Sequence, residues 1–129
     1  MPSFHETAIS AAAPEDVWKL LYDPSRFPEW WAGVESVEVA SAGEYTLYPD
    51  GYPEFPMAQL LTTARSEQRV TVSCLVSDLR FDWRLEPDGA GTRILVDVDL
   101  PESEAHRLAT QKRLIRSSVG RLAELAAHP

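Results

Sequence analysis

Residues that could bind a metal ion or attack a substrate are few and scattered in this chain. The histidines His5, His106 and His128 lie far apart, and Cys74 is the only cysteine. A zinc site needs three or four protein ligands of these kinds. The chain also lacks a Gly-x-Ser-x-Gly turn and a glycine-rich phosphate-binding motif, which mark serine-hydrolase and nucleotide sites. The sequence therefore predicts no metal and no cofactor.

Acidic residues suited to acid–base catalysis fall on the outer side of the predicted strands. Four aspartates alternate with large apolar residues, and alternate residues of a strand face opposite sides of a sheet. They are Asp78, Asp82, Asp97 and Asp99. A general base has to reach its substrate, so these carboxylates are poor candidates. The residues that remain for a catalytic role are Arg65 and Tyr48, with Glu44 as a third.

Aromatic residues point instead to a pocket for an apolar molecule, since small-molecule pockets are lined mainly by apolar and aromatic side chains. The competing interpretation is that these rings fill the core. Cys74 is expected inside as a small apolar residue, while alternation leaves open which way Gln59 points. Either Tyr45 or Tyr48 is expected near the mouth of the pocket, together with Tyr52 and Phe55. Gln111 and Ser118 are expected to border the apolar stripe of the last helix, where they could touch a ligand. The predicted ligand-binding residues are Trp30, Trp31, Tyr48, Gln59, Cys74, Phe81, Trp83, Ile115 and Ser118.

The elements that must hold these residues begin with a strand over 4–10 and two short helical turns. Pro14 stands at a first helical position, where its missing N–H costs nothing. Pro24 marks a second helical start, and Pro28 prevents one long helix. Strands are predicted at 34–40, 44–48, 57–65, 69–76, 79–86 and 92–100. The strand over 79–86 has the clearest alternation of apolar and polar residues.

A final helix of about 23 residues is predicted after Pro101, long enough to cross the domain. Leu108, Ile115 and Leu122 recur every seven residues and predict a buried stripe. The opposite face is basic, and it is either a solvated surface or a docking surface for an acidic partner. The element order predicts an α+β fold. We expect a curved seven-stranded antiparallel sheet wrapped around a long C-terminal helix, with two short helices after the first strand.

Composition limits the class of protein. The chain has 129 residues, so we expect a single domain over 1–129. Its net charge is −8. The negative charge argues against nucleic acid and against anionic membrane surfaces. No apolar run approaches the roughly 20 residues that span a bilayer. A lone cysteine suits a reducing cytoplasm.

Two segments resemble a known superfamily. The run from Ala13 to Val34, continuing into Glu35–Val39, joins a helix start, two proline-initiated turns, a Phe/Trp/Trp cluster and a strand. It resembles the N-terminal part of the helix-grip (START-like, SRPBCC) superfamily, in its polyketide cyclase/dehydratase-like branch. The hairpin joining Leu85-Glu86-Pro87 to Gly91-Thr92-Arg93 resembles the same superfamily. That superfamily includes START lipid-transfer domains and birch-pollen-allergen-like proteins, so the resemblance implies a container with an apolar cavity between helix and sheet.

Three functions follow as hypotheses. The leading one is a cytoplasmic monomer or homodimer that holds an apolar ligand, aromatic, polyketide-like or lipid-like, in an internal cavity. The second is a polyketide cyclase or aromatase in which Arg65 or Tyr48 stabilises an enolate oxygen, as preorganised donors do. The third is a protein-interaction module that docks through the basic helix or the proline-rich loop over 49–56.

Overall fold

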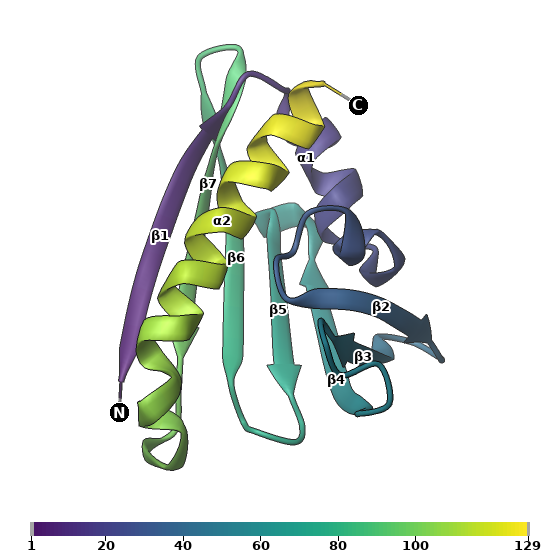
Figure 1. Ribbon diagram of the computed structural model, residues 1–129. Helices are drawn as coiled ribbons and strands as arrows, with labels where there is room; N and C mark the ends of the chain where they lie inside the picture. The colour runs from purple at the N-terminus through teal and green to yellow at the C-terminus, as the bar shows by residue number, and fades with distance from the viewer. Residues whose placement is uncertain (1, 129) are drawn as a thin grey trace.

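A computed structural model describes residues 2–128 as one antiparallel sheet and the helices packed against it (Figure 1). The strands are β1 (Ser3–Ser10), β2 (Val34–Val39), β3 (Glu44–Pro49), β4 (Met57–Ala64), β5 (Arg69–Cys74), β6 (Arg80–Asp88) and β7 (Gly91–Asp99). The helices are α1 (Pro14–Leu21) and α2 (Leu108–Ala127), and the 3-10 turns are η1 (Pro24–Glu29), η2 (Arg65–Glu67) and η3 (Glu102–Arg107). The predicted α+β architecture, with its seven strands, long final helix and two short helices, is confirmed.

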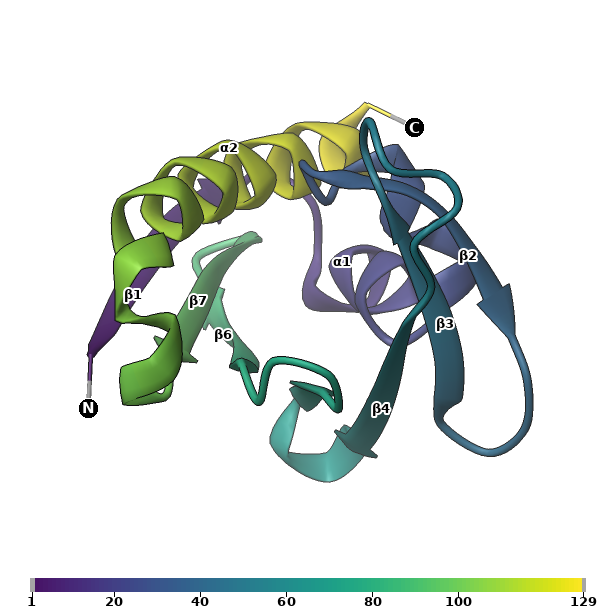
Figure 2. The ribbon, with the colours of Figure 1, turned by 60° about the horizontal axis from the view of Figure 1, so that its bottom comes forward.

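The sheet follows the chain order except at its first strand. Its order is β1-β7-β6-β5-β4-β3-β2, and every neighbouring pair is antiparallel. β1 pairs with β7 over its whole length, from Ser3 opposite Asp99 to Ser10 opposite Thr92. Figure 2 shows the sheet bending so that β2–β4 face α2 from the far side. The buried core lies in the space between the sheet and the two helices.

Helix α2 presents one apolar stripe to this space. Its buried residues are Gln111, Ile115, Ser118, Val119, Leu122, Ala123 and Ala126, which recur at the spacing of one helical face. Leu108 packs at the edge of the core and is only partly buried. The Ser10 hydroxyl donates to the Ala123 carbonyl at 2.7 Å, which ties the end of β1 to the last turns of α2.

The single helix predicted after Pro101 is divided in the structure. Its first six residues form the 3-10 turn η3, and the 20-residue α2 follows directly. The Leu108 N–H still bonds to the Ala105 carbonyl in the 3-10 pattern. Arg107 is the last residue of η3 and leads into the long helix.

Aromatic rings fill the half of the interior that lies under α1 and η1. Phe27, Trp30 and Trp83 are completely buried. The rings of Trp30 and Trp83 meet edge to face with centroids 5.1 Å apart, a favourable arrangement for aromatic pairs. The indole N–H of Trp30 donates to the Leu20 carbonyl at 3.0 Å, which fixes this ring against the end of α1.

The outer face of the sheet carries the charged residues. Asp82 on β6 is ion-paired with Arg69 on β5, and Asp97 on β7 is 3.1 Å from Arg84 on β6. The expected outward orientation of these two aspartates is therefore confirmed. The strand predicted over 69–76 ends earlier, at Cys74, and Val76 lies 55% exposed in the following loop. The strand therefore ends two residues before its predicted end.

Replacing Gly91 by alanine tests the close contact between β1 and β7. A Cβ at this position would lie 2.2 Å from the Ser10 carbonyl oxygen, so the backbone has to shift. We expect Gly91→Ala to lower the free energy of unfolding by about 1–3 kcal/mol. Urea unfolding followed by circular dichroism measures it.

Gly120 provides the matched control, since it lies exposed within α2 and a Cβ there meets nothing within 4 Å. Gly120→Ala should raise the free energy of unfolding by about 0.5–1 kcal/mol, because glycine is a poor helix former. Equal effects of the two variants would contradict the proposed contact.

Candidate ligand pocket

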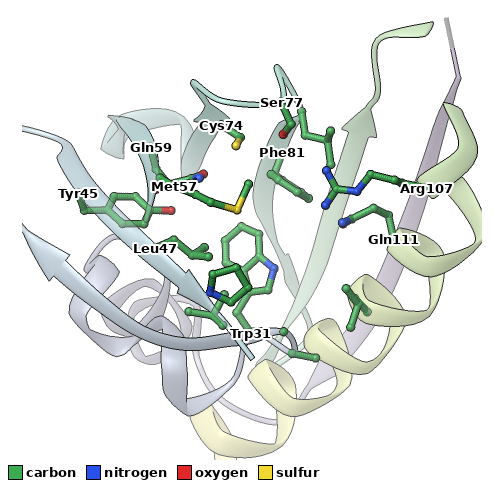
Figure 3. A pocket seen from close by; sticks show the side chains of 16 residues that line it. Trp31, Tyr45, Leu47, Met57, Gln59, Cys74, Ser77, Phe81, Arg107 and Gln111 are labelled. Atoms are coloured by element: carbon green, nitrogen blue, oxygen red, sulfur yellow. Dashed lines mark hydrogen bonds between the residues drawn. The ribbon is translucent and has the colours of Figure 1, made fainter. Parts of the chain in front are cut away.

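A pocket of about 150 Å³ lies in the other half of the interior. Figure 3 shows its side chains converging from the sheet on one side and from α2 on the other. Its lining comes from five places along the chain. It comprises Trp31, Ala32, Gly33 and Val34 before and at the start of β2; Tyr45, Leu47 and Pro49 of β3; Met57 and Gln59 of β4; Cys74, Ser77, Leu79 and Phe81 around β5 and β6; and Arg107, Gln111 and Leu114 beside and on α2.

Trp31 forms the boundary between the filled half and the pocket. Its ring stacks on Trp30 with centroids 5.4 Å apart and meets Trp83 and Phe81 edge to face at 5.3 and 5.0 Å. Of these four rings, only Trp31 and Phe81 line the pocket. The other two are completely buried behind Trp31. Trp31 is therefore held on its buried side and faces the pocket on the other.

The phenol of Tyr45 is a polar group without a partner on the sheet side of the pocket. The residue is 2% exposed, and its hydroxyl makes no hydrogen bond to any residue within 2–128. Figure 3 shows the hydroxyl directed toward the pocket. Burial, with a smaller contribution from the neighbouring Cys74, raises the pKa of Tyr45 far above its ordinary value. The phenol consequently stays protonated and neutral, able to donate a hydrogen bond.

Two polar side chains approach the pocket from the opposite side. Arg107 and Gln111 extend from the region of α2 toward its centre (Figure 3). One guanidinium nitrogen of Arg107, Nη1, donates to Glu104 at 2.8 Å. The Gln111 side chain is buried and forms no hydrogen bond within the described part of the chain. The pocket thus has an apolar floor between polar groups on two facing walls.

Ser118 holds the pocket wall in place from below. Its hydroxyl accepts from the backbone N–H of Ala32 at 2.9 Å and donates to the Leu114 carbonyl at 2.6 Å. The segment that carries Trp31 and Ala32 is therefore attached to the middle of α2. Ser118 therefore both accepts and donates a hydrogen bond, and it positions the pocket wall without lining the pocket.

Four of the predicted ligand-binding residues, Trp31, Gln59, Cys74 and Phe81, line this pocket. Their contact with a ligand stays a prediction. The inward orientation of Gln59, left open by alternation, is settled by its 4% exposure. Four others do not line it, because neighbouring side chains enclose them completely. These are Trp30, Trp83, Ile115 and Ser118.

The three residues suggested for catalysis, Arg65, Tyr48 and Glu44, do not line the pocket. Strand β4 ends at Ala64 and Arg65 begins the turn η2, so its side chain is 72% exposed and lies 3.9 Å from Glu15. Arg65 therefore does not occupy the interior position that the suggested catalytic role requires. Tyr48 alternates with the pocket-lining Leu47 and so faces the other side of β3.

The aromatic residues expected at the mouth from the proline-rich loop are on the surface. Tyr52 and Phe55 are more than half exposed and do not line the pocket. Turns formed by the loop, with Tyr52 N–H bonded to the Pro49 carbonyl and Phe55 N–H to the Tyr52 carbonyl, direct this segment away from the interior.

Arg107 is the charged pocket residue that the sequence did not place there. It belongs to the basic residues of the last helix, which were interpreted as either a solvated surface or a docking surface. The signal was nonetheless present, because Arg107, Gln111, Leu114 and Ser118 follow one another at spacings of four, three and four residues. Such spacing places residues on one helical face, and this face adjoins the predicted apolar stripe.

Residues 2–128 contain no group of three or more His, Cys, Asp or Glu side chains placed to hold a metal ion. None of the helices described is long and apolar enough to cross a membrane.

The sheet, the long helix and the pocket between them define a helix-grip protein. Residues 1–127 match the family model described as "Polyketide cyclase / dehydrase and lipid transport". The chain belongs to this family. No curated protein matches the chain.

Solved structures support the fold across the whole chain. XoxI from Bacillus cereus superposes with a TM-score of 0.79 at 15% identity, over 99% of this chain and 97% of that one. A START superfamily protein from Mycobacterium smegmatis superposes with a TM-score of 0.74 at 16% identity, over 95% of this chain and 98% of that one. BexL, a di-domain ARO/CYC protein of the BE-7585A biosynthetic pathway, superposes with a TM-score of 0.79 at 16% identity. The match covers this entire chain and 48% of BexL. At these identities the likeness concerns the fold.

Replacing Tyr45 by phenylalanine tests whether its hydroxyl is unpaired. A buried hydroxyl without a partner is destabilising, so Tyr45→Phe should raise the free energy of unfolding by about 1 kcal/mol. Tyr22→Phe, at a 46% exposed position, should change it by less than about 0.5 kcal/mol. A clear loss of stability in Tyr45→Phe would indicate a hydrogen-bond partner.

Replacing Ser118 by alanine removes the acceptor for the Ala32 N–H. We expect the free energy of unfolding to fall by about 1–3 kcal/mol, the cost of leaving a buried donor unpaired. Ser117→Ala, at the exposed neighbouring position, is the matched control and should be nearly neutral. Denaturant titrations of both variants measure the difference in their free energies of unfolding. Equal stabilities would contradict the proposed attachment of Ala32 to α2 through Ser118.

Proposed function

We propose that this protein binds a small, mainly apolar molecule in the pocket between β3–β6 and α2. The observation that carries the proposal is the unpartnered Tyr45 hydroxyl at a pocket with an apolar floor. Buried polar groups in proteins nearly always have a hydrogen-bond partner. A ligand oxygen or nitrogen would supply it, while the apolar part of the ligand rests on Trp31 and Phe81.

The family to which the chain belongs supports a binding role, since its description includes lipid transport. The printed names of the similar structures, a START superfamily protein and an ARO/CYC protein, fit small-molecule binding as well. Arg65 and Tyr48 lie outside the pocket, so binding is favoured over a cyclase reaction that depends on either of them. The pocket of about 150 Å³ beside the filled half favours it over a pure interaction module, which needs no hollow.

The volume of the pocket limits the size of its ligand. An apolar cavity of about 150 Å³ accommodates benzene, whereas pockets for drug-sized ligands measure about 300–1,000 Å³. We therefore infer a ligand whose enclosed part is about one ring in size. Leu47, Met57 and Arg107 at the rim are only half-buried, so a longer molecule would extend outward between them.

Toluene is a suitable probe for this function. Ligands that bind only the folded state stabilise it, so the Tm should rise with toluene concentration and calorimetry should give one saturable site. Leu47→Trp, which places a larger side chain in the pocket, should abolish both effects. Leu60→Trp, on the exposed face of the adjacent strand, should retain them. Absence of saturable toluene binding to the unmodified protein would overturn the proposed function.

A further inference from the structure

The polar groups of the pocket differ in kind between its two walls. On the α2 side the lining contains a guanidinium, that of Arg107, and the amide of Gln111. No aspartate or glutamate lines the pocket among the residues that the structure describes. The remaining polar groups on the sheet side, which include the neutral phenol of Tyr45, carry no negative charge at neutral pH. The pocket therefore offers hydrogen-bond donors and one cation, with no matching anion inside.

Arg107 is held in place without using all of its donors. Its Nη1 donates to Glu104 at 2.8 Å, and both side chains are partly buried. A guanidinium has five N–H donors arranged in a planar fork, so Nε and Nη2 are left for another acceptor. Glu104 is three residues earlier on η3 and is absent from the pocket lining. It thus orients the guanidinium from outside the pocket.

Gln111 lies one helical turn after Arg107 and is directed to the same region of the pocket (Figure 3). The residue is 7% exposed, and its side-chain amide has no hydrogen-bond partner within residues 2–128. An amide N–H and a guanidinium that face one space are complementary to a carboxylate, which accepts hydrogen bonds at both oxygens. Arginine binds carboxylates particularly well because its fork matches their planar geometry.

We propose that the pocket takes a small monocarboxylate. Its carboxylate contacts Arg107 and Gln111, and its apolar body, about one aromatic ring in size, rests on Trp31 and Phe81. The proposal rests on the proposed binding function and adds the chemical class of the ligand. The net charge of the chain, −8, opposes non-specific uptake of anions, so affinity for a carboxylate has to come from these particular side chains.

Three probes of similar shape separate the contributions to binding. Toluene supplies the ring alone, benzamide adds a neutral polar group, and benzoate adds a carboxylate that is ionised at pH 7. Calorimetric titration of the unmodified protein at low ionic strength should show benzoate binding at least about tenfold more tightly than benzamide, as a charge-assisted hydrogen bond allows.

Arginine variants on the same helical segment assign that preference to a residue. Arg107→Gln should weaken benzoate binding about tenfold while toluene binding stays unchanged, which also verifies that the variant is folded. Arg113→Gln removes the same charge from an exposed position outside the pocket and should leave benzoate affinity as it is. Glu104→Gln keeps a hydrogen-bond acceptor that can orient Arg107 but removes the negative charge beside it, so benzoate binding should strengthen.

The outcomes distinguish the two proposals. If toluene shows no saturable binding, the proposed function fails, and the carboxylate proposal that rests on it fails with it. If toluene binds and benzoate binds no better than benzamide, the pocket function stands and the carboxylate proposal is overturned. Equal losses of benzoate affinity in Arg107→Gln and Arg113→Gln would also overturn it, because the effect would then come from net charge alone.

Discussion

The packing of one indole ring, that of Trp31, determines how the interior of this protein is divided. Trp30 and Trp83 press on it from the filled side, and Phe81 meets its edge beside the hollow. Aromatic rings packed in this way are rigid and present a large apolar surface. The space beyond Trp31 therefore stays open because its floor cannot collapse into a core that is already full.

The pocket combines this rigid floor with attachments that act over long sequence distances. Ser118 joins the middle of α2 to Ala32, and Ser10 joins the end of the helix to β1. These hydroxyls fix the distance between helix and sheet, which would otherwise be set only by side-chain packing. A hollow that is bounded by hydrogen bonds on one side and stacked rings on the other keeps its shape in the absence of a ligand. Such preorganisation reduces the ordering cost of binding.

The architecture was predictable from the sequence because strong local signals agree with one another. Alternation over 79–86, the proline-initiated turns and the seven-residue recurrence in the last helix each specify one element, and the structure contains all of them. The pocket was predictable only in part. Alternation identifies an inner face but not where a strand ends, which is why the strands predicted to reach Arg65 and Val76 end at Ala64 and Cys74. It also cannot tell a completely enclosed ring such as Trp83 from one that borders a hollow such as Phe81, since both lie on the same face of β6.

The pairing of β1 with β7 has a consequence for how the chain acquires its structure. Within residues 2–128, the first strand has no sheet neighbour other than the last one, and Ser3 meets Asp99 across most of the sequence. Contacts between such distant residues slow folding, because a long segment must be ordered before they form. During synthesis, which proceeds from the N-terminus, β1 emerges from the ribosome long before its partner exists. β1 can therefore take its place in the sheet only after β7 has been made.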